Sequence, residues 1–419
     1  MIKHIFKIIW TERKMNSWIL LELILVFCIL WFCVDYLYFT TKRYFEPKGF
    51  DTEHTYIINV SMKDEGRETL ASGDEENKQQ ILDDIWTIYD RIKKYPLIES
   101  ASYSHASQPY SGSWSSSSIM VDSVEVEFRY KRVTSGYFDV FKIKLESGTI
   151  FDWNNVISES PVVISTNRNG LIGGKLAQEI KYLNPDKENK EKVIGVAEKS
   201  KRSEYEDYYI TLYKPLRKDD LSLSSYREIC VRVKPDADKN FAEQFTNDMR
   251  GQLEIGPYYL SSVRPIDEYR EEYMEWMQFS NNFKSIYSIS TFLIINIFLG
   301  IVGTFWFRIQ SRRSDIGLRI AMGASKKNVR SMFIMETIIL LFIASLIATP
   351  ICINITMADI LKDIGIPAIN REWTDVEFSQ YFIDFAITFI FLTVIATLAI
   401  WLPAHKASNI QPAMALRDE

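Results

Sequence analysis

The sequence of 419 residues is poor in the side chains that build redox and metal chemistry, with four cysteines and four histidines. Cys230 is the one cysteine outside the long apolar segments, so no disulfide can form there within the chain, and neither C-x-x-C nor H-E-x-x-H occurs. A G-x-S-x-G elbow, a kinase signature and a dinucleotide fingerprint are also absent. We therefore expect no catalytic residue and no metal ligand in this chain.

The segment 170–175, GLIGGK, comes nearest to a phosphate-binding loop. The Walker pattern needs four residues between its glycines and a Ser or Thr directly after the lysine. Here three residues separate Gly170 from Gly174, and Leu176 follows Lys175. The segment fails on both counts, and we expect no cofactor to bind to this chain directly.

Four long apolar runs interrupt an otherwise ordinary composition. The mean hydropathy of −0.09 and the 25% of charged residues are typical of a soluble protein. A bilayer core needs a helix of about 20 apolar residues. The runs predict transmembrane helices at 17–39, 285–307, 332–355 and 381–402, with the first as an uncleaved anchor because no small-x-small cleavage site follows it. The expected fold class is a membrane protein of four transmembrane α-helices, with a large α+β outer domain at 40–284 between the first two.

Positive charge is concentrated at 308–331, between the second and third predicted spans. The loop has seven basic residues against the single acid Asp315. Such loops stay in the cytoplasm because positive residues resist translocation. The amino-terminal segment 1–16 is also basic, whereas the loop 356–380 is mainly acidic. We therefore expect 1–16, 308–331 and the tail 403–419 inside, and the outer domain and the loop 356–380 outside.

The outer domain has helical and strand patterns in mixed order. Isoleucines on one face predict a helix at 78–95, and Phe241, Phe245 and Met249 predict a second at 238–253. Alternation predicts a strand at 124–133 whose Arg129 and Lys131 side lies in water, and short apolar runs predict strands at 161–165, 193–196 and 229–233. The serine-rich segment 111–118 has no periodicity and predicts a flexible loop, in which Trp114 is either a contact residue or folds back onto the domain.

Ionisable side chains inside the spans are few. Glu22, Asp35 and Asp384 lie near span ends, and Glu336 lies about one turn into the third span. Glu336 could pair with the basic loop beside it. A transporter that moves ions through the bilayer needs polar groups at its site. Their scarcity indicates that the protein handles its cargo outside the membrane.

The basic loop and the tail together carry a family pattern. The segment 312–325, RRSDIGLRIAMGAS, resembles the signature of MacB/FtsX-type ABC transporter permeases, and the tail resembles the ending of the same family. Weaker similarities to its periplasmic core domain occur at 132–151, 193–196 and 213–216. The matching loop residues are Arg312, Arg313, Asp315, Ile316, Gly317, Arg319, Gly323, Ala324 and Ser325, with Glu336 in the next span, and those of the tail include Pro403, Ala404, Ala407, Pro412, Ala415 and Leu416.

The resemblance implies a non-catalytic permease subunit in the inner (cytoplasmic) membrane, with the outer domain in the periplasm. It implies coupling of the loop to a separate cytoplasmic ABC ATPase, which would bind ATP and Mg. Other implied partners are a second permease copy or a paralogue, a periplasmic adaptor with an outer-membrane channel, and membrane lipid, but no nucleic acid. Efflux or export by mechanotransmission is the expected function. An FtsX-like signalling subunit is the alternative, and a membrane-anchored periplasmic enzyme is a third hypothesis.

The loop also has the features of a coupling element. Ile309, Ile316 and Ile320 recur at helical spacing, which predicts an amphipathic helix with a cationic rim. Gly323 can end that helix, and Ser325 can cap the next. The arginines could seat the helix on an ATPase, or they could only fix the topology and bind lipid headgroups.

Overall fold

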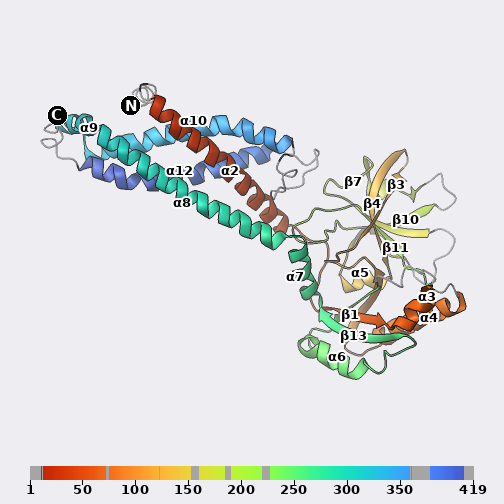
Figure 1. Ribbon diagram of the computed structural model, residues 1–419. Helices are drawn as coiled ribbons and strands as arrows, with labels where there is room; N and C mark the ends of the chain where they lie inside the picture. Colours follow the sequence, from red (N-terminus) through yellow and green to blue (C-terminus); the bar gives the residue numbers. More distant parts are fainter. Residues whose placement is uncertain are drawn as a thin grey trace. The chain divides into compact units, whose positions relative to one another are not determined.

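The computed structural model describes residues 11, 13–71, 75–121, 123–151, 160–184, 190–218, 227–358, 360 and 378–409. They form two compact units (Figure 1). The helical unit combines Met1–Thr41 with Phe279–Glu419, and the sheet unit is Lys42–Gln278. The chain therefore passes between the units twice, once within the first long helix and once after Gln278.

The helical unit contains four helices that are long and apolar enough to cross a membrane. They are α2 (Arg13–Phe45), α8 (Phe279–Ser311), α10 (Lys326–Met357) and α12 (Phe378–Ser408), with the short α9 (Arg313–Ala321) between α8 and α10. Helix α12 packs against both α8 and α10, and the long helices lie side by side (Figure 1). The predicted fold class is confirmed, and the helices extend past the predicted spans because their polar end turns continue the same hydrogen-bond ladder.

Large apolar side chains lie on both the inner and outer surfaces of this bundle. Phe27, Trp31 and Phe333 are completely buried in one shared core. Phe292 and Ile390, in contrast, are more than 60% exposed. A helix that is apolar all round requires an apolar environment outside as well as inside. The pattern is that of helices surrounded by lipid.

The sheet unit is built on a mixed sheet that has eleven strands among the described residues. Its order is β13-β1-β12-β2-β4-β11-β6-β10-β5, while β3 pairs with β4 and β9 with β10. The pairs β4–β11 and β6–β10 are parallel, and the other pairs are antiparallel. The strands are β1 (Thr55–Met62), β2 (Ile98–His105), β3 (Ser115–Val121), β4 (Val124–Val133), β5 (Leu145–Gly148), β6 (Ser160–Ser165), β9 (Tyr182–Leu183), β10 (Glu191–Ala197), β11 (Thr211–Pro215), β12 (Arg227–Val233) and β13 (Tyr258–Pro265).

Helices cover parts of this sheet. Helices α4 and α5 pack on β2. Helix α6 packs on β13 (Figure 1). The apolar faces predicted from the isoleucines of α4 and from Phe241, Phe245 and Met249 of α6 are confirmed as buried. The helices are α3 (Asp64–Ala71), α4 (Glu75–Lys93), α5 (Gly136–Val140), α6 (Phe241–Met249) and α7 (Ile266–Trp276), with the 3₁₀ turns η2 (Ala177–Glu179) and η4 (Asp238–Asn240).

One local prediction for this unit is wrong, and another is confirmed only in part. The predicted loop at 111–118 contains the start of β3, because Ser115–Val121 forms a continuous antiparallel ladder with β4. Tertiary pairing thus overrides the weak strand preference of four serines. The predicted helix at 238–253 is divided into η4 and a shorter α6 that ends at Met249.

The segment that resembled a phosphate loop is a small β-hairpin. Strands β7 (Leu171–Ile172) and β8 (Lys175–Leu176) pair through a two-residue turn. Gly173 and Gly174 have φ angles of 59° and 83°. Such turns need positive φ at both central residues, which glycine adopts without strain. The glycines therefore have a conformational role here.

Candidate functional site

The basic loop between α8 and α10 forms a helix-turn connection. Helix α9 ends at Ala321, and Gly323 follows with a φ of 95°, the left-handed conformation that ends many helices. Ser325 then caps α10, because its hydroxyl accepts a hydrogen bond of 3.2 Å from the backbone N–H of Asn328. The predicted roles of Gly323 and Ser325 in helix termination and capping are confirmed.

The apolar stripe of the loop faces inward. Ile309 and Ile316 are buried in the core of the helical unit, and Ile320 packs against that core. The predicted single amphipathic helix is wrong, because the chain turns at Arg312 and places Ile309 in α8 and Ile316 in α9. The stripe therefore anchors α9 to the bundle. The large apolar side chains that α9 and the following turn expose are Leu318 and Met322, at 49% and 73%.

Glu336 forms a buried ionic contact at one end of the bundle. Its Oε1 lies 2.9 Å from Nη1 of Arg308, and both side chains are at most 1% exposed. Its Oε2 accepts a hydrogen bond of 3.3 Å from Nη1 of Arg312. Arg308 also donates to the side-chain oxygen of Asn16. Helices α2, α8 and α10 thus meet at one polar cluster, and removing one partner of a buried ion pair strands the other charge.

The other candidate residues of the loop lie around this anchor. Gly317 is buried, Arg313, Arg319 and Ala324 are half-buried, and Ser325 is exposed. Arg319 contacts the sulfur of Met332 at 3.5 Å. The backbone of Asp315 lies in α9, and its side chain is outside the described part of the chain.

The tail residues belong partly to a span helix. Pro403, Ala404 and Ala407 are buried within α12, which continues to Ser408. Ala404 and Ala407 are completely buried in the core of the helical unit, so close packing accounts for their small side chains. The predicted tail residues Pro412, Ala415 and Leu416 lie outside the described residues.

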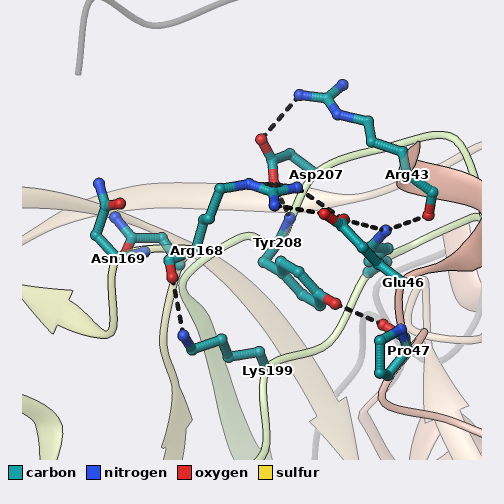
Figure 2. Close-up of polar contacts among 10 residues, drawn as sticks. Arg43, Glu46, Pro47, Arg168, Asn169, Lys199, Asp207 and Tyr208 are labelled. Atoms are coloured by element: carbon teal, nitrogen blue, oxygen red, sulfur yellow. Dashed lines mark hydrogen bonds and ion pairs between the residues drawn. The ribbon is translucent and has the colours of Figure 1, made fainter. Parts of the chain in front are cut away.

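A second charged cluster lies in the sheet unit, directly after the first span. Its members, which we call the exit cluster, are Arg43, Glu46, Arg168, Lys201 and Asp207. Figure 2 shows Arg168 between two acids: its Nη1 and Nη2 donate to the carboxylate of Glu46 at 2.6 and 2.8 Å, and its Nε donates to Asp207 at 3.0 Å. Arg43 donates to the other oxygen of Asp207 at 2.8 Å. Lys201 donates to Glu46 at 2.9 Å and to the carbonyl oxygen of Arg43 at 2.7 Å.

The electrostatics of Glu46 indicate a strong local interaction. Burial alone would raise the pKa of Glu46, but the hydrogen bonds from Arg168 and Lys201 outweigh it and lower that pKa to about 2. The side chain of Lys201 is fully buried, and that of Glu46 is 18% exposed. The bidentate pair with Arg168 adds directional specificity. The cluster therefore fixes the end of α2 to the sheet unit.

The same segment of the sheet unit, 200–208, also holds α7. Arg270 donates to Glu204 at 2.7 Å, and the hydroxyl of Tyr273 donates to Glu206 at 2.8 Å. Glu204 accepts a further hydrogen bond of 2.9 Å from the hydroxyl of Tyr110. Helix α7 is the last helix of the sheet unit before Phe279 begins α8. Within the sheet unit, one segment thus contacts both the end of α2 and helix α7.

Sequence reasoning missed the exit cluster and its link to α7. Arg43 and Glu46 follow the first apolar run, and charges at such a position indicate only a span end. Arg168 lies 122 residues away from Glu46 in sequence, so no local pattern could pair them. Within the described residues, no group of three His, Cys, Asp or Glu side chains is arranged to hold a metal ion.

Comparison with known proteins places these features in a family. Residues 287–412 match the family model described as FtsX-like permease C-terminal, which spans α8 to the tail. The macrolide export ATP-binding/permease protein MacB of Neisseria meningitidis serogroup A is 22% identical over 302 residues, which cover 68% of this chain and 42% of that protein. MacB of Acinetobacter baylyi is 24% identical over 345 residues, which cover 77% of this chain and 48% of that protein.

A solved structure also aligns with this chain. The periplasmic region of MacB from Actinobacillus actinomycetemcomitans is 16% identical, with a TM-score of 0.33, and the alignment covers 55% of this chain and 97% of that one. The chain spans less than half the length of the MacB relatives described above. The matched permease domain coincides with α8, α9, α10 and α12, including the buried Glu336 contact. Residues 287–412 therefore match an FtsX-like permease domain, and most of the chain is similar to MacB-type ABC transporter permeases.

Proposed function

We propose that this chain is the permease subunit of a MacB-like ABC transporter and transmits ATP-driven movement from a separate cytoplasmic ATPase to a periplasmic domain. The sheet unit is that periplasmic domain, and the protein lies in the inner (cytoplasmic) membrane. The chain does no catalysis, and ATP and Mg bind to the ATPase. The transport direction is efflux or export.

The structure of α9 carries this proposal. Ile316 buries one side of the helix in the bundle, so a force on α9 acts on the span helices. Leu318 and Met322 are exposed beside a loop rich in arginine and lysine. Apolar contacts surrounded by charge are typical of protein interfaces. A soluble ATPase could bind there, with Arg313 and Lys327 at its rim.

The two places where the chain passes between the units would transmit this movement to the sheet unit. In this scheme, movement of α2 would act on the exit cluster through Arg43, and movement of α8 would act on α7, which precedes it in the chain. The exit cluster and α7 both contact the segment 200–208 through hydrogen bonds. A rigid hub of this kind would convert helix movement into movement of the whole sheet.

The proposed partners follow from the same scheme. Two ATPase subunits would need two permease subunits, supplied by a second copy or a paralogue. A periplasmic adaptor and an outer-membrane channel would receive cargo expelled by the sheet units. The basic loop would also contact anionic lipid headgroups at the membrane surface.

The test is association with the ATPase. We would substitute Leu318→Asp and Met322→Asp together, because both side chains are exposed and the core of the bundle stays intact. The protein would be purified from membranes of its host in gentle detergent, and bound chains with Walker motifs would be identified by mass spectrometry. We expect an ABC ATPase with the wild type and about tenfold less with the variant, as for loss of a central apolar contact.

The control is Val124→Asp in β4, which introduces an aspartate in place of an apolar residue that is 47% exposed in the sheet unit. It should retain the ATPase. If the wild type brings down no ABC ATPase, or if the loop variant retains it fully, the proposal fails. A cell-wall hydrolase or a histidine kinase recovered in its place would support the signalling alternative.

A further inference from the structure

The sheet unit contains a small cavity beside the exit cluster. Its volume is ≈ 30 Å³, and it lies where β4, β11 and the segments 106–108, 113–114 and 200–202 meet. One water needs about 10–15 Å³ measured in this way. The cavity therefore has room for one small polar group and not for a whole drug-sized molecule.

Four cationic residues line this cavity. Lys201 belongs to the exit cluster and is paired with Glu46, and the other three are Arg129, Lys131 and Arg202. Arg129 and Lys131 come from β4, and Arg202 comes from the segment that carries the exit cluster. The prediction that Arg129 and Lys131 lie in open water is wrong, since both are half-buried. In the part of the chain that the structure describes, no carboxylate lies within ion-pair distance of any of the three.

Aromatic rings hold these cations in place. The guanidinium carbon of Arg129 lies 3.2 Å from the ring centre of Tyr209, and that of Arg202 lies 4.4 Å from the ring of Trp114. Lys131 donates a hydrogen bond of 3.0 Å to the hydroxyl of Tyr137. Stacking of this kind orients a guanidinium group and leaves its edge able to donate hydrogen bonds. Arg202 uses one of these donors, Nη2, for the carbonyl oxygen of Ser111.

The acids that act on these cations, Glu228 and Glu206, already accept hydrogen bonds from other groups, Glu206 from the hydroxyls of Ser203 and Tyr273. The buried carboxylate of Glu228 already accepts hydrogen bonds from the backbone N–H groups of Ser107 and Gln108, at 2.7 and 2.8 Å, and from the hydroxyl of Ser104. The pKa of Lys131 is lowered to about 8, mainly by burial. The positive charges of Arg129 and Arg202 also lower this pKa, whereas the carboxylate of Glu228 raises it. The site thus has an excess of positive charge in a partly dry environment.

We propose that this cavity binds a carboxylate or phosphate group of a ligand, with Arg129, Lys131 and Arg202 as its cationic donors. Such an oxyanion would supply the missing countercharge and accept charge-assisted hydrogen bonds. Trp114, which is 50% exposed at the rim, would contact the part of the ligand next to the anionic group. This site is independent of the proposed ATPase contact, so either can fail without the other.

The test is calorimetric titration of the full chain in detergent micelles with benzoate, acetate, phenyl phosphate and inorganic phosphate. The uncharged benzamide serves as the matched control ligand. We expect saturable binding of a carboxylate or a phosphate but not of benzamide. Tighter binding of benzoate and acetate would identify a carboxylate ligand, and tighter binding of phenyl phosphate and inorganic phosphate would identify a phosphate ligand. Arg129→Gln and Arg202→Gln should each weaken binding about tenfold or more, because each removes a charged donor.

Two controls keep the proposal falsifiable. Arg91→Gln on the exposed side of α4 changes the net charge equally and should bind like the wild type. Reductive methylation of the wild type, read by mass spectrometry, should label Lys131 less with the bound anion than with benzamide, and this readout needs no variant. The proposal is overturned by absence of saturable anion binding, by equal weakening in the Arg91 variant, or by anion binding that leaves Lys131 unprotected.

Discussion

Replacing Glu46 with glutamine should destabilise the sheet unit in a pH-dependent manner. The carboxylate binds Arg168 through two hydrogen bonds and Lys201 through one, and the side chain of Lys201 has no exposure to water. Glutamine keeps the shape but loses the charge. The buried ammonium of Lys201 would then lack its nearest counterion.

The magnitude follows from the altered proton affinity. The pKa of Glu46 falls from its ordinary 4.5 to about 2. Since each tenfold change in proton affinity is worth about 1.4 kcal/mol, the ionised side chain stabilises the fold by about 3 kcal/mol near neutral pH. A group whose pKa is lowered by folding stabilises above its unfolded pKa, and this contribution disappears as the pH falls from 4.5 towards 2. At about pH 3 roughly 1.4 kcal/mol should remain.

The assay is urea unfolding of the full chain in detergent, with amide hydrogen exchange in β6 and β11 used to monitor the unfolding of the sheet unit. The free energy of unfolding of wild type and Glu46→Gln is compared at about pH 7 and about pH 3. Glu254→Gln is the control, because its pair with Lys63 is exposed and should cost less than about 1 kcal/mol. A Glu46→Gln penalty below about 1 kcal/mol near neutral pH, or one that is equal at both pH values, would refute the reasoning.

Three further outcomes are expected. Glu336→Gln should destabilise the helical unit by about 3–5 kcal/mol in detergent denaturation, because Arg308 is completely buried beside it. The control, Lys327→Gln on the exposed first turn of α10, should cost under about 0.5 kcal/mol. Equal effects of the two variants would contradict the role of the Arg308–Glu336 pair. Gly136→Ala should lower the free energy of unfolding in urea by about 1–3 kcal/mol, because the new methyl group would lie 2.1 Å from the carbonyl oxygen of Ala101. The control is Gly251→Ala, where nothing lies within 4 Å of the new methyl group. An unchanged free energy of unfolding for Gly136→Ala would contradict this steric argument. Tyr273→Phe should increase the rate of amide hydrogen exchange in α7 by about fivefold, because one hydrogen bond to Glu206, worth about 1 kcal/mol, is lost. An unchanged exchange rate would show that the segment 200–208 does not stabilise α7.

The sequence by itself determined the features that repeat over short distances. Span helices are visible as runs of apolar residues, and the helix ends at Gly323 and Ser325 depend on neighbours a few residues away. The limits of β4 follow from alternation, because side chains of a strand point alternately to two faces. The buried face of α4 follows from helical periodicity in the same way.

The tertiary structure alone decided which distant residues meet. The sheet order brings β4, β11 and β6 together. The folding of the connecting segments over these strands places Arg168 beside Glu46, and Arg129 and Arg202 at one cavity. Strand β3 forms from serines because β4 supplies a partner for its backbone. An arginine has the same local pattern whether it faces water, an acid or a cavity. Its environment depends on contacts between segments far apart in the chain, and no short-range periodicity encodes those contacts.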